Sequence, residues 1–460
     1  MLRAKTILLV PVLALAFTAC GGGEIAGSVA AGSGGSIGTG ETTPPSTPTG
    51  LTAASGSNEV SLFWNASTDN VGVAQYLVHR NGSHVATVAS TSYLDFGLLA
   101  STNYTYTVSA VDTSGNASAK TTSVAATTLA SGAPTQLAQL AGSLTPGTWA
   151  TLATMNINAT LLDPGGASGY ITGDAESIKW DPLTRQLFFL GMDHHPNTGQ
   201  RFVSYSDSTN TWQILPQTSW MATGGVHHGY DHKALDVAHR YLYVRGQYMD
   251  RSVYRYQIDT KTWERVQDNN VLEYSQCCGG WDYFPELNGV VWFQGSDTQS
   301  GSTFYGGLFL RDDLTGSWRR LGARATYVSG DYNNFAEYNP KHKVVIFGGG
   351  SRDLYKLDSS GGVTTLNPAP VSIGNRSGVV TMDPVSGNYL VLSNTNNSFH
   401  SYNVASDTWQ LLPASPIFQF QANPPNGGIF GVVATPISTY GVSLFVQCAT
   451  NNCVVRLYKH

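Results

Sequence analysis

Short stretches in which apolar and polar residues alternate fill the chain from residue 44 to residue 129. They read VSLFW, QYLVHRNG, HVATV, TSYLDFG and NYTYTVSAVD. Alternation over such lengths predicts β-strands with one buried face. Asn81-Gly82 falls between two of these stretches, and this dipeptide favours the tight turn of a β-hairpin. The pattern therefore predicts a small all-β domain.

A second pattern repeats between residues 147 and 460. Each unit has an apolar opening strand (SIKWDP, KALDV, WDYFP, FAEYNP, VVTMDP, VVATP), a second apolar strand and a third strand with Tyr or Phe. A fourth strand carries Trp: GTWATL (147–152), NTWQIL (210–215), KTWERV (261–266), GSWRRL (316–321) and DTWQLL (407–412), with GGVTTL (361–366) as a degenerate copy. From the copy at 210–215 onward, the copies recur about every 45 to 55 residues, the range of four-stranded propeller repeats.

The two ends of this pattern complement each other. There are six opening strands, but the last unit has no Trp strand, and GTWATL has no opening strand. Pairing the two would close a ring and leave no exposed sheet edge. We predict a six-bladed β-propeller; a seventh unit within residues 155–174 is the alternative. The tryptophans are expected to pack between blades: Trp149, Trp212, Trp263, Trp318 and Trp409.

Both regions resemble known families. Residues 44–129 resemble a bacterial fibronectin type III domain, in PPSTPTGL (44–51), Trp64, Tyr76, Tyr93, Leu98, YTYTVSAVD (104–112) and Gly115-Asn116. The resemblance implies a β-sandwich with Trp64 and the tyrosines at core and corner positions, and no chemistry. The Trp-containing repeats resemble kelch and galactose-oxidase-like propellers. The copper-site motifs of galactose-oxidase-like enzymes do not match here residue by residue.

The N-terminus MLRAKTILLVPVLALAFTAC predicts export. Two basic residues precede an apolar run that is too short to span a bilayer, as in a signal peptide. Its end resembles a bacterial lipobox, which implies cleavage before Cys20 and lipid on the Cys20 thiol; a signal peptide with a chance cysteine is the alternative. The expected organisation is a signal peptide (1–20), a flexible Gly/Ser/Thr linker (21–43), the fibronectin-like domain (44–129), a linker (130–146) and the propeller (147–460). The expected location is the bacterial outer membrane or cell surface through this lipid, or the medium.

Composition fits an exported protein. Only 12% of residues are charged and the net charge is −5, which argues against a nucleic-acid partner. Apart from Cys20 there are four cysteines, an even number that favours disulfides in an oxidising compartment. Cys448 and Cys453 flank a predicted hairpin loop and are expected to pair. The adjacent Cys277 and Cys278 either form a vicinal disulfide or remain free thiols. We expect a monomer.

The stretch GGVHHGYDHKALDV (224–237) concentrates histidines. His228, Tyr230 and His232 lead into the second opening strand, and His194 and His195 lie in a loop of the preceding unit. The repeat pattern assigns both loops to the same face of the propeller. Other polar or aromatic residues assigned to this face are Glu176, Asp250, Arg251, Trp281, Asp282, Asn333, Asn334, Arg352, Asn375, Arg376 and His400.

Three functions are compatible with this face. The first is binding of an extracellular glycan or protein without turnover. The second is a polysaccharide lyase acting on uronic-acid polymers, in which His228, Tyr230 and His194 would move protons. Arg251, Trp281, Asn333, Arg352 and Arg376 would then hold the substrate, with arginine pairing to its carboxylates. The third is a surface scaffold. No motif requires a cofactor, although a divalent metal, Zn or Ca, held by His195 and His232 is compatible with the lyase.

Overall fold

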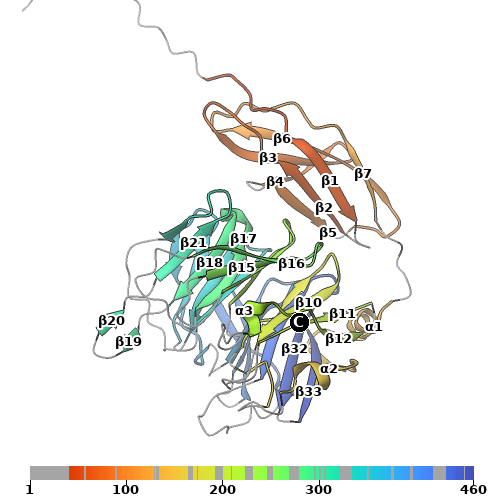
Figure 1. Ribbon diagram of the computed structural model, residues 1–460, viewed down its shortest axis with the longest axis vertical. Helices are drawn as coiled ribbons and strands as arrows, with labels where there is room; N and C mark the ends of the chain where they lie inside the picture. Colours follow the sequence, from red (N-terminus) through yellow and green to blue (C-terminus); the bar gives the residue numbers. More distant parts are fainter. Residues whose placement is uncertain are drawn as a thin grey trace, which may run out of the picture. The chain divides into compact units, whose positions relative to one another are not determined.

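The structure is a computed structural model. It describes residues 41–55, 59–88, 91–96, 98–128, 130, 134–163, 169–173, 175–191, 200–208, 210–222, 232–245, 252–268, 279–294, 297–299, 302–304, 307–321, 334–349, 352–373, 378–393, 397–417, 431–449 and 451–460. Strands dominate throughout, as the alternating patterns predict (Figure 1). No helix among these residues is long and apolar enough to cross a membrane.

The first seven strands form a two-sheet sandwich with orders β1-β2-β5 and β4-β3-β6-β7. Their bounds are β1 (Thr49–Ser55), β2 (Glu59–Asn65), β3 (Val73–Arg80), β4 (Ser83–Val88), β5 (Ser92–Phe96), β6 (Asn103–Asp112) and β7 (Val124–Thr127). Trp64 and Tyr76 pack edge to face in the core at 5.5 Å between ring centroids. The hydroxyl of Tyr104 accepts a hydrogen bond from the backbone N–H of Leu99 at 3.1 Å, which makes a tyrosine corner.

The predicted hairpin turn of the sandwich is confirmed. Asn81 and Gly82 join β3 to β4 with φ values of 49° and 82°. Positive φ at both central residues is the geometry of a type I′ turn, whose twist matches that of the flanking strands. Asn and Gly are the residues that adopt it most readily.

Among the described residues, six four-stranded antiparallel sheets follow (Figure 1). Sheet 1 contains β9 (Lys179–Asp181), β10 (Gln186–Gly191), β11 (Arg201–Ser206) and β12 (Thr211–Ile214); sheet 2 contains β13 (Lys233–Asp236), β14 (Tyr241–Arg245), β15 (Ser252–Gln257) and β16 (Thr262–Asp268); sheet 3 contains β17 (Gly280–Phe284), β18 (Gly289–Gln294), β21 (Gly307–Asp312) and β22 (Trp318–Leu321). Sheet 4 contains β23 (Asn334–Asn339), β24 (Val344–Gly349), β25 (Leu354–Asp358) and β26 (Val363–Thr365); sheet 5 contains β27 (Gly378–Met382), β28 (Tyr389–Ser393), β29 (Phe399–Asn403) and β30 (Thr408–Leu411); sheet 6 contains β31 (Val432–Ile437), β32 (Val442–Ala449), β33 (Asn452–Lys459) and β8 (Thr148–Leu152).

The remaining elements are short. They are α1 (Gln136–Ser143), α2 (Ile157–Leu161), α3 (Ser219–Ala222), the 3₁₀ helix η1 (Pro285–Leu287) and a two-stranded sheet of β19 (Asp297–Gln299) and β20 (Ser302–Phe304). The segment 155–174, considered above as a seventh unit, holds α2, and its described residues form no strand.

Sheet 6 is assembled from the two ends of the repeat region. Strand β8 pairs antiparallel with β33, with Trp149 opposite Tyr458 and Leu152 opposite Val455. The stretch GTWATL thus completes the last unit, as the repeat pattern predicts. The first strands of the six sheets also contact one another in a cycle: β9 contacts β13, β13 contacts β17, β17 contacts β23, β23 contacts β27, β27 contacts β31 and β31 contacts β9.

The strands of each sheet end on two opposite sides, and these sides differ in the connections they carry. We call the side on which the first strand turns into the second strand the turn edge. There, a residue with positive φ ends each of the six turns: Arg185, Arg240, Asn288, Lys343, Gly387 and Gly441. An acceptor side chain often opens the turn, as where Asp181 accepts from the backbone N–H of Thr184 at 3.1 Å. The opposite edge, the mouth edge, carries the longer connections, including 215–232, 269–279, 322–333 and 412–431.

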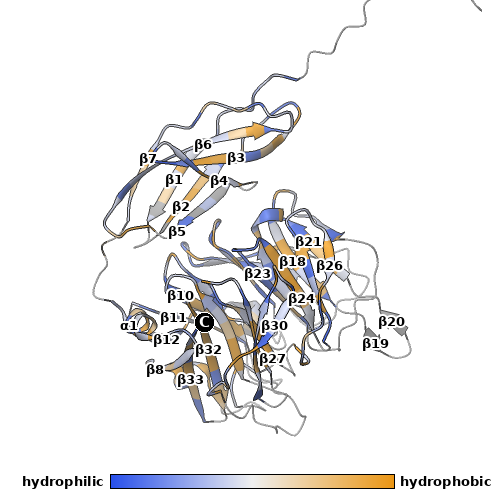
Figure 2. Cartoon of the chain, turned by 180° about the vertical axis from the view of Figure 1, so that it is seen from behind, coloured by the Kyte–Doolittle hydropathy of each residue, from blue (hydrophilic) through white to orange (hydrophobic). Residues whose placement is uncertain are grey.

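The tryptophans of the fourth strands pack between neighbouring sheets, as predicted. Figure 2 shows apolar residues along the strands, and many of these residues are buried. Trp149 of sheet 6 lies 5.2 Å from Phe399 of sheet 5, between ring centroids. Trp263 of sheet 2 lies 5.0 Å from Phe202 of sheet 1. Trp212, Trp318 and Trp409 join the core clusters shared with neighbouring sheets.

A buried ion triad links three of the first strands. The Lys179 ammonium of β9 lies 3.0 Å from an Asp282 oxygen of β17 and 3.9 Å from a Glu337 oxygen of β23. These side chains are about one-tenth exposed. Sheets 1, 3 and 4 are thereby joined by charge as well as by packing.

Candidate functional site

Most of the predicted site residues lie outside the described residues. These are His194, His195, His228, Tyr230, Arg251, Asn333 and Arg376, as well as Cys20, Cys277 and Cys278. The described members of the predicted face are Glu176, His232, Trp281, Asp282, Asn334, Arg352 and His400.

The structure brings His232 and Trp281 together at the mouth edge. His232 directly precedes β13 and Trp281 lies near the start of β17, with 6.4 Å between their ring centroids. The Nε2 atom of His232 accepts a hydrogen bond from the backbone N–H of Gly279 at 3.2 Å. Nε2 therefore carries no proton, and the neutral ring carries its proton on Nδ1. Within the described part of the chain, no three His, Cys, Asp or Glu side chains are arranged to hold a metal ion.

Two side chains that the sequence pattern did not single out join this pair. Arg245 ends β14, is 1% exposed, and lies with its guanidinium carbon 4.6 Å from the centre of the Trp292 ring. Trp292 is the cross-strand partner of Trp281, and their rings are 5.5 Å apart. The sequence feature that could have identified Arg245 is its position at the end of the otherwise apolar stretch YLYVR (241–245). We call His232, Arg245, Trp281 and Trp292 the donor cluster.

The indole N–H groups of this cluster are buried without an acceptor. Among the described residues, the Nε1 atoms of Trp281 and Trp292 have no hydrogen-bond partner, and the same holds for the adjacent Trp318 and for Trp64 and Trp263. By contrast, Trp212 Nε1 of sheet 1 donates to Thr154 Oγ1 at 3.1 Å. An unsatisfied buried donor costs about 1–3 kcal/mol. Trp281 is itself fully buried, so it packs in the core rather than presenting a ring face at the surface.

The other described residues of the predicted face do not form one site. Arg352 is exposed and donates through Nε to the carbonyl of Ala369, which leaves its terminal nitrogens for other partners. His400 is buried beside Trp409, and burial lowers the pKa of its imidazole. Asp282 belongs to the ion triad with Lys179.

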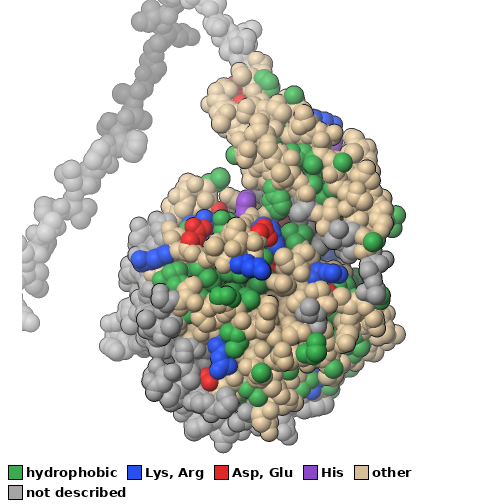
Figure 3. All heavy atoms as spheres, turned by 45° about the vertical axis from the view of Figure 1, so that its right-hand side comes forward, with side chains coloured by type: hydrophobic (Ala, Val, Ile, Leu, Met, Phe, Trp, Pro, Cys, Tyr) green, Lys and Arg blue, Asp and Glu red, His purple; other side chains and the backbone are tan. Residues whose placement is uncertain are grey.

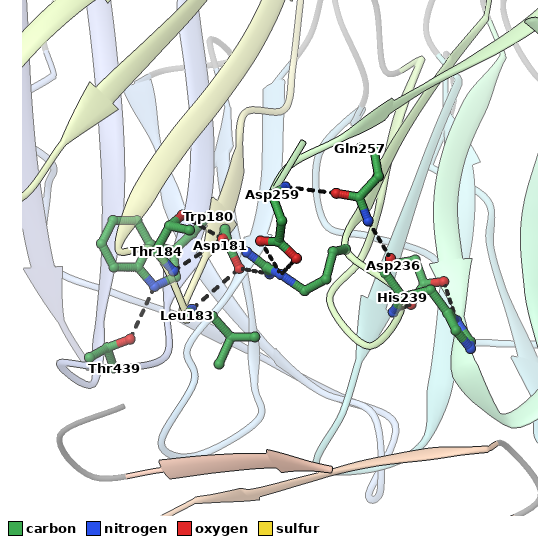
Figure 4. Close-up of polar contacts among 10 residues, drawn as sticks. Trp180, Asp181, Leu183, Thr184, Asp236, His239, Gln257, Asp259 and Thr439 are labelled. Carbon is green, nitrogen blue, oxygen red and sulfur yellow. Dashed lines mark hydrogen bonds and ion pairs between the residues drawn. The ribbon is translucent and has the colours of Figure 1, made fainter. Parts of the chain in front are cut away.

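The turn edge is closed by polar contacts between neighbouring sheets (Figure 4). Arg240 of sheet 2 donates to both Asp181 oxygens of sheet 1, at 2.7 and 2.8 Å, and also to Asp259 at 3.1 Å. Sheets 1 and 6 are joined by Trp180 Nε1, which donates to Thr439 Oγ1 at 3.2 Å.

Similar contacts close the remaining junctions. They are the hydrogen bonds from Tyr243 to Asp313 (sheets 2 and 3), Tyr338 to Glu286 (sheets 3 and 4), Asn339 to the Gly387 carbonyl (sheets 4 and 5) and Ser443 to the Met382 carbonyl (sheets 5 and 6). The bidentate pair of Arg240 with Asp181 also fixes geometry. Polar contacts thus join every neighbouring pair of the six sheets at the turn edge.

A histidine at the turn edge has a raised pKa. His239 Nδ1 lies 2.7 Å from the buried Asp236 carboxylate, and this hydrogen bond raises the pKa of His239. The stabilisation that this pair gives to the folded protein is therefore complete below the unfolded pKa of about 6.5, and it is lost as the pH rises through the folded pKa.

We expect His239→Gln to lower the free energy of unfolding more at about pH 5.5 than at about pH 9, as measured by urea denaturation.

His342 in the equivalent turn of sheet 4 is the matched control. Burial and the neighbouring Lys341 lower the pKa of His342, so its effect has the opposite sign. The cost of His342→Gln should grow toward high pH. The same pH trend in both variants would contradict the assignment of the His239–Asp236 pair.

The predicted disulfide Cys448–Cys453 is confirmed. The two cysteines face each other in register on β32 and β33, and both are 4% exposed. The bridge therefore braces the hairpin of sheet 6 at the mouth edge.

Charge on the surface is mixed. On the face drawn in Figure 3, acidic and basic side chains lie among a majority of uncharged ones. The described residues on this face therefore form no broad field of one sign.

Comparison with known proteins gives relatives for part of the chain. No family model matches. Chitinase Chi52 of Paenibacillus xylanexedens is 54% identical over 101 residues, 22% of this chain and 19% of the chitinase. Exoglucanase B of Cellulomonas fimi is 38% identical over 133 residues, 28% of this chain and 12% of the exoglucanase. The chain thus matches less than a fifth of the length of either enzyme.

Among solved structures, the fibronectin type-III domain of human fibronectin type III domain containing protein 3 is 21% identical. The match covers 20% of this chain and 94% of that one, with a TM-score of 0.18. The assignment of the sandwich rests on the sheet orders β1-β2-β5 and β4-β3-β6-β7 and on the tyrosine corner at Tyr104. Strands β1 to β7 form a fibronectin type III domain.

Proposed function

We infer that the protein is exported and binds a glycan through the mouth edge of its six sheets, which are the blades of a β-propeller. The cyclic contacts of the first strands and the completion of sheet 6 by β8 support the propeller. Closure of this kind removes the free sheet edges that a linear array of sheets would leave at its ends.

The contrast between the two edges supports the mouth edge as the binding face. Short turns and inter-sheet hydrogen bonds occupy the turn edge, as in the Arg240–Asp181 pair. The long connections and the donor cluster lie at the opposite edge. Binding residues are concentrated on loops that a rigid scaffold positions. The turn edge is then the scaffold and the mouth edge is the site.

The observation that carries the choice of ligand is the likeness to two enzymes with different named activities. A chitinase and an exoglucanase each share a segment with this chain. Because the shared segment accompanies different activities, it does not itself supply the chemistry. Both names describe enzymes that act on polysaccharides. A glycan is therefore the ligand that this likeness favours.

The predicted signal peptide and Cys20 support export and a lipid anchor, and both lie outside the described residues. The Cys448–Cys453 bridge supports an oxidising compartment. The anchored protein would present its mouth edge at the cell surface.

The test is a binding screen of protein lacking residues 1–20. Retention would be measured on immobilised chitin, cellulose, xylan, pectate and alginate, for the full mature chain and for a chain that begins at residue 134. We expect both chains to be retained on at least one of these glycans, because the six sheets supply the site. Retention only of the longer chain would move binding to the fibronectin type III domain, and no retention on any glycan would refute the proposal.

The same screen tests catalysis. Unsaturated products or new reducing ends in the supernatant would favour the lyase over the binding protein. A variant that lacks His228 would then show whether the histidine-rich segment carries the activity.

A further inference from the structure

We propose that Trp220 and Tyr254 form an aromatic platform at the mouth edge, on which the sugar rings of a neutral glycan stack. We call these two side chains the aromatic platform. Its ligand is an uncharged polysaccharide whose sugar rings present an apolar face of C–H groups, such as chitin or cellulose. This inference rests on the proposed glycan-binding function and adds the contact residues and the chemical class of the ligand.

The aromatic platform lies at the junction of sheets 1 and 2. Trp220 belongs to α3, within the mouth-edge connection 215–232 that leads from sheet 1 to sheet 2. Tyr254 is the third residue of β15, a strand that begins at the mouth edge. The platform is therefore continuous with the face to which we assign glycan binding.

The two rings of the platform stack on one another. Their centroids are 4.1 Å apart and their planes make an angle of 10°. Trp263 of β16 supports Trp220 from the edge, at 5.3 Å between ring centroids and an angle of 80°. Trp220 and Tyr254 are partly exposed, whereas the adjoining core residues Phe202 and Met221 are fully buried. An aromatic pair that stays partly exposed beside a closed core offers ring area to a ligand.

The segment that carries Trp220 is fixed in place by the protein itself. Gln217 clamps it to β11, because its Oε1 accepts from the backbone N–H of Phe202 at 3.0 Å and its Nε2 donates to the Phe202 carbonyl at 3.2 Å. The backbone N–H of Leu215 donates to the same carbonyl at 2.8 Å. Met221, next to Trp220, is buried in the core shared by sheets 1 and 2. A ring that is already held in place loses little conformational entropy on binding.

A neutral sugar fits the aromatic platform better than a charged one. The C–H groups on one face of a pyranose ring are apolar, and packing them against an aromatic ring removes apolar surface from water. Neither an indole nor a phenol ring supplies a cation. An ionised carboxylate placed on these rings would lose hydration without gaining a partner of opposite charge. The platform therefore favours chitin or cellulose over a uronic-acid polymer.

The experiment measures the binding of chitohexaose, cellohexaose and hexagalacturonate to protein lacking residues 1–20, by isothermal titration calorimetry. We expect at least one of the two neutral oligosaccharides to bind, and to bind more tightly than hexagalacturonate. Trp220→Ala should weaken the affinity for it at least about tenfold, equivalent to about 1.4 kcal/mol. Trp220→Phe keeps a smaller aromatic ring and should lose less.

Trp409→Ala is the matched control. Trp409 is also partly exposed and lies 4.6 Å from the ring of Tyr402, between centroids, but it is close to the turn edge of sheet 5. Its removal should leave the affinity unchanged. Circular dichroism checks the folding of each variant. Protection of tryptophan fluorescence from acrylamide by the bound oligosaccharide, present in the wild type and reduced in Trp220→Phe, is a second readout that does not require Trp220→Ala to fold.

The outcomes separate the two proposals. Wild-type affinity of folded Trp220→Ala for a neutral oligosaccharide overturns the aromatic platform and leaves the proposed function standing. Tighter binding of hexagalacturonate than of both neutral oligosaccharides overturns the assignment of an uncharged ligand. Binding of no oligosaccharide overturns the proposed function and the platform together.

Discussion

Replacing Lys179 by methionine should lower the free energy of unfolding by about 3–5 kcal/mol. The methionine keeps most of the packing volume but removes the Lys179 ammonium from the buried Asp282 and Glu337 carboxylates. Both lie within 4 Å of the Lys179 ammonium and are about one-tenth exposed. Removing one partner from a buried ion pair is costly because the remaining charge cannot return to water. Urea denaturation followed by tryptophan fluorescence measures the loss.

Two further variants identify the cause. Lys261→Met removes an exposed lysine and should change stability by less than about 0.5 kcal/mol. Adding Glu337→Gln to Lys179→Met removes one of the stranded charges and should recover part of the loss. The deficit of Lys179→Met should also shrink toward acid pH, because a buried carboxyl without a cation is more stable when protonated. A loss that neither Glu337→Gln nor acid relieves would point to packing instead of charge.

The parts of the fold that follow from local pattern could be predicted from the sequence. Alternating residues define the strands of the sandwich, and Asn81-Gly82 defines its hairpin, because both signals depend on neighbours in the chain. The assembly of sheet 6 was also predictable. The stretch GTWATL lacked an opening strand and the last unit lacked a Trp strand, so each implied the other.

Contacts between units were not predictable from the repeat pattern. The pattern gives Lys179, Asp282 and Glu337 the same place in three opening strands, but only the folded chain brings β9 near β17 and β23. The same holds for Arg240, which reads as an ordinary turn residue until its pairing with Asp181 is seen. Such pairs depend on which sheets become neighbours and on the direction in which each side chain leaves its strand.

For the predicted face, the structure agrees with the sequence prediction for some residues and differs from it for others. His232 and Trp281 were expected to share a face, and they meet at the mouth edge. The expected surface role of Trp281 does not agree with its full burial, because Trp281 packs against the preceding sheet, sheet 2. Arg245 and Trp292 belong to the cluster through cross-strand pairing and cation–π stacking, which a list of loop residues does not reveal.

Loss of β8 should prevent stable folding of the six sheets. Without it, β33 becomes an open edge, and sheet 6 loses Trp149, which packs against Phe399, Phe445 and Tyr458 at 4.8–5.2 Å between ring centroids. Truncating one buried tryptophan alone costs about 3–5 kcal/mol, a large part of the stability of an ordinary domain. We expect a chain of residues 134–460 to unfold cooperatively and a chain of residues 153–460 to show no cooperative transition.

Adding the missing segment as a separate peptide distinguishes the completion of sheet 6 by β8 from a general effect of truncation. A peptide of residues 134–152 should bind the 153–460 chain by pairing with β33 and restore the transition, because an extended segment can add to an open sheet edge. The same peptide with Trp149→Ala and Leu152→Ala keeps the backbone donors and acceptors but loses the buried side chains, so it should restore much less. Cooperative unfolding of the 153–460 chain without any peptide would mean that five sheets and a three-stranded remnant are stable alone. Closure by β8 would then serve to protect the edge of β33 rather than to hold the ring together.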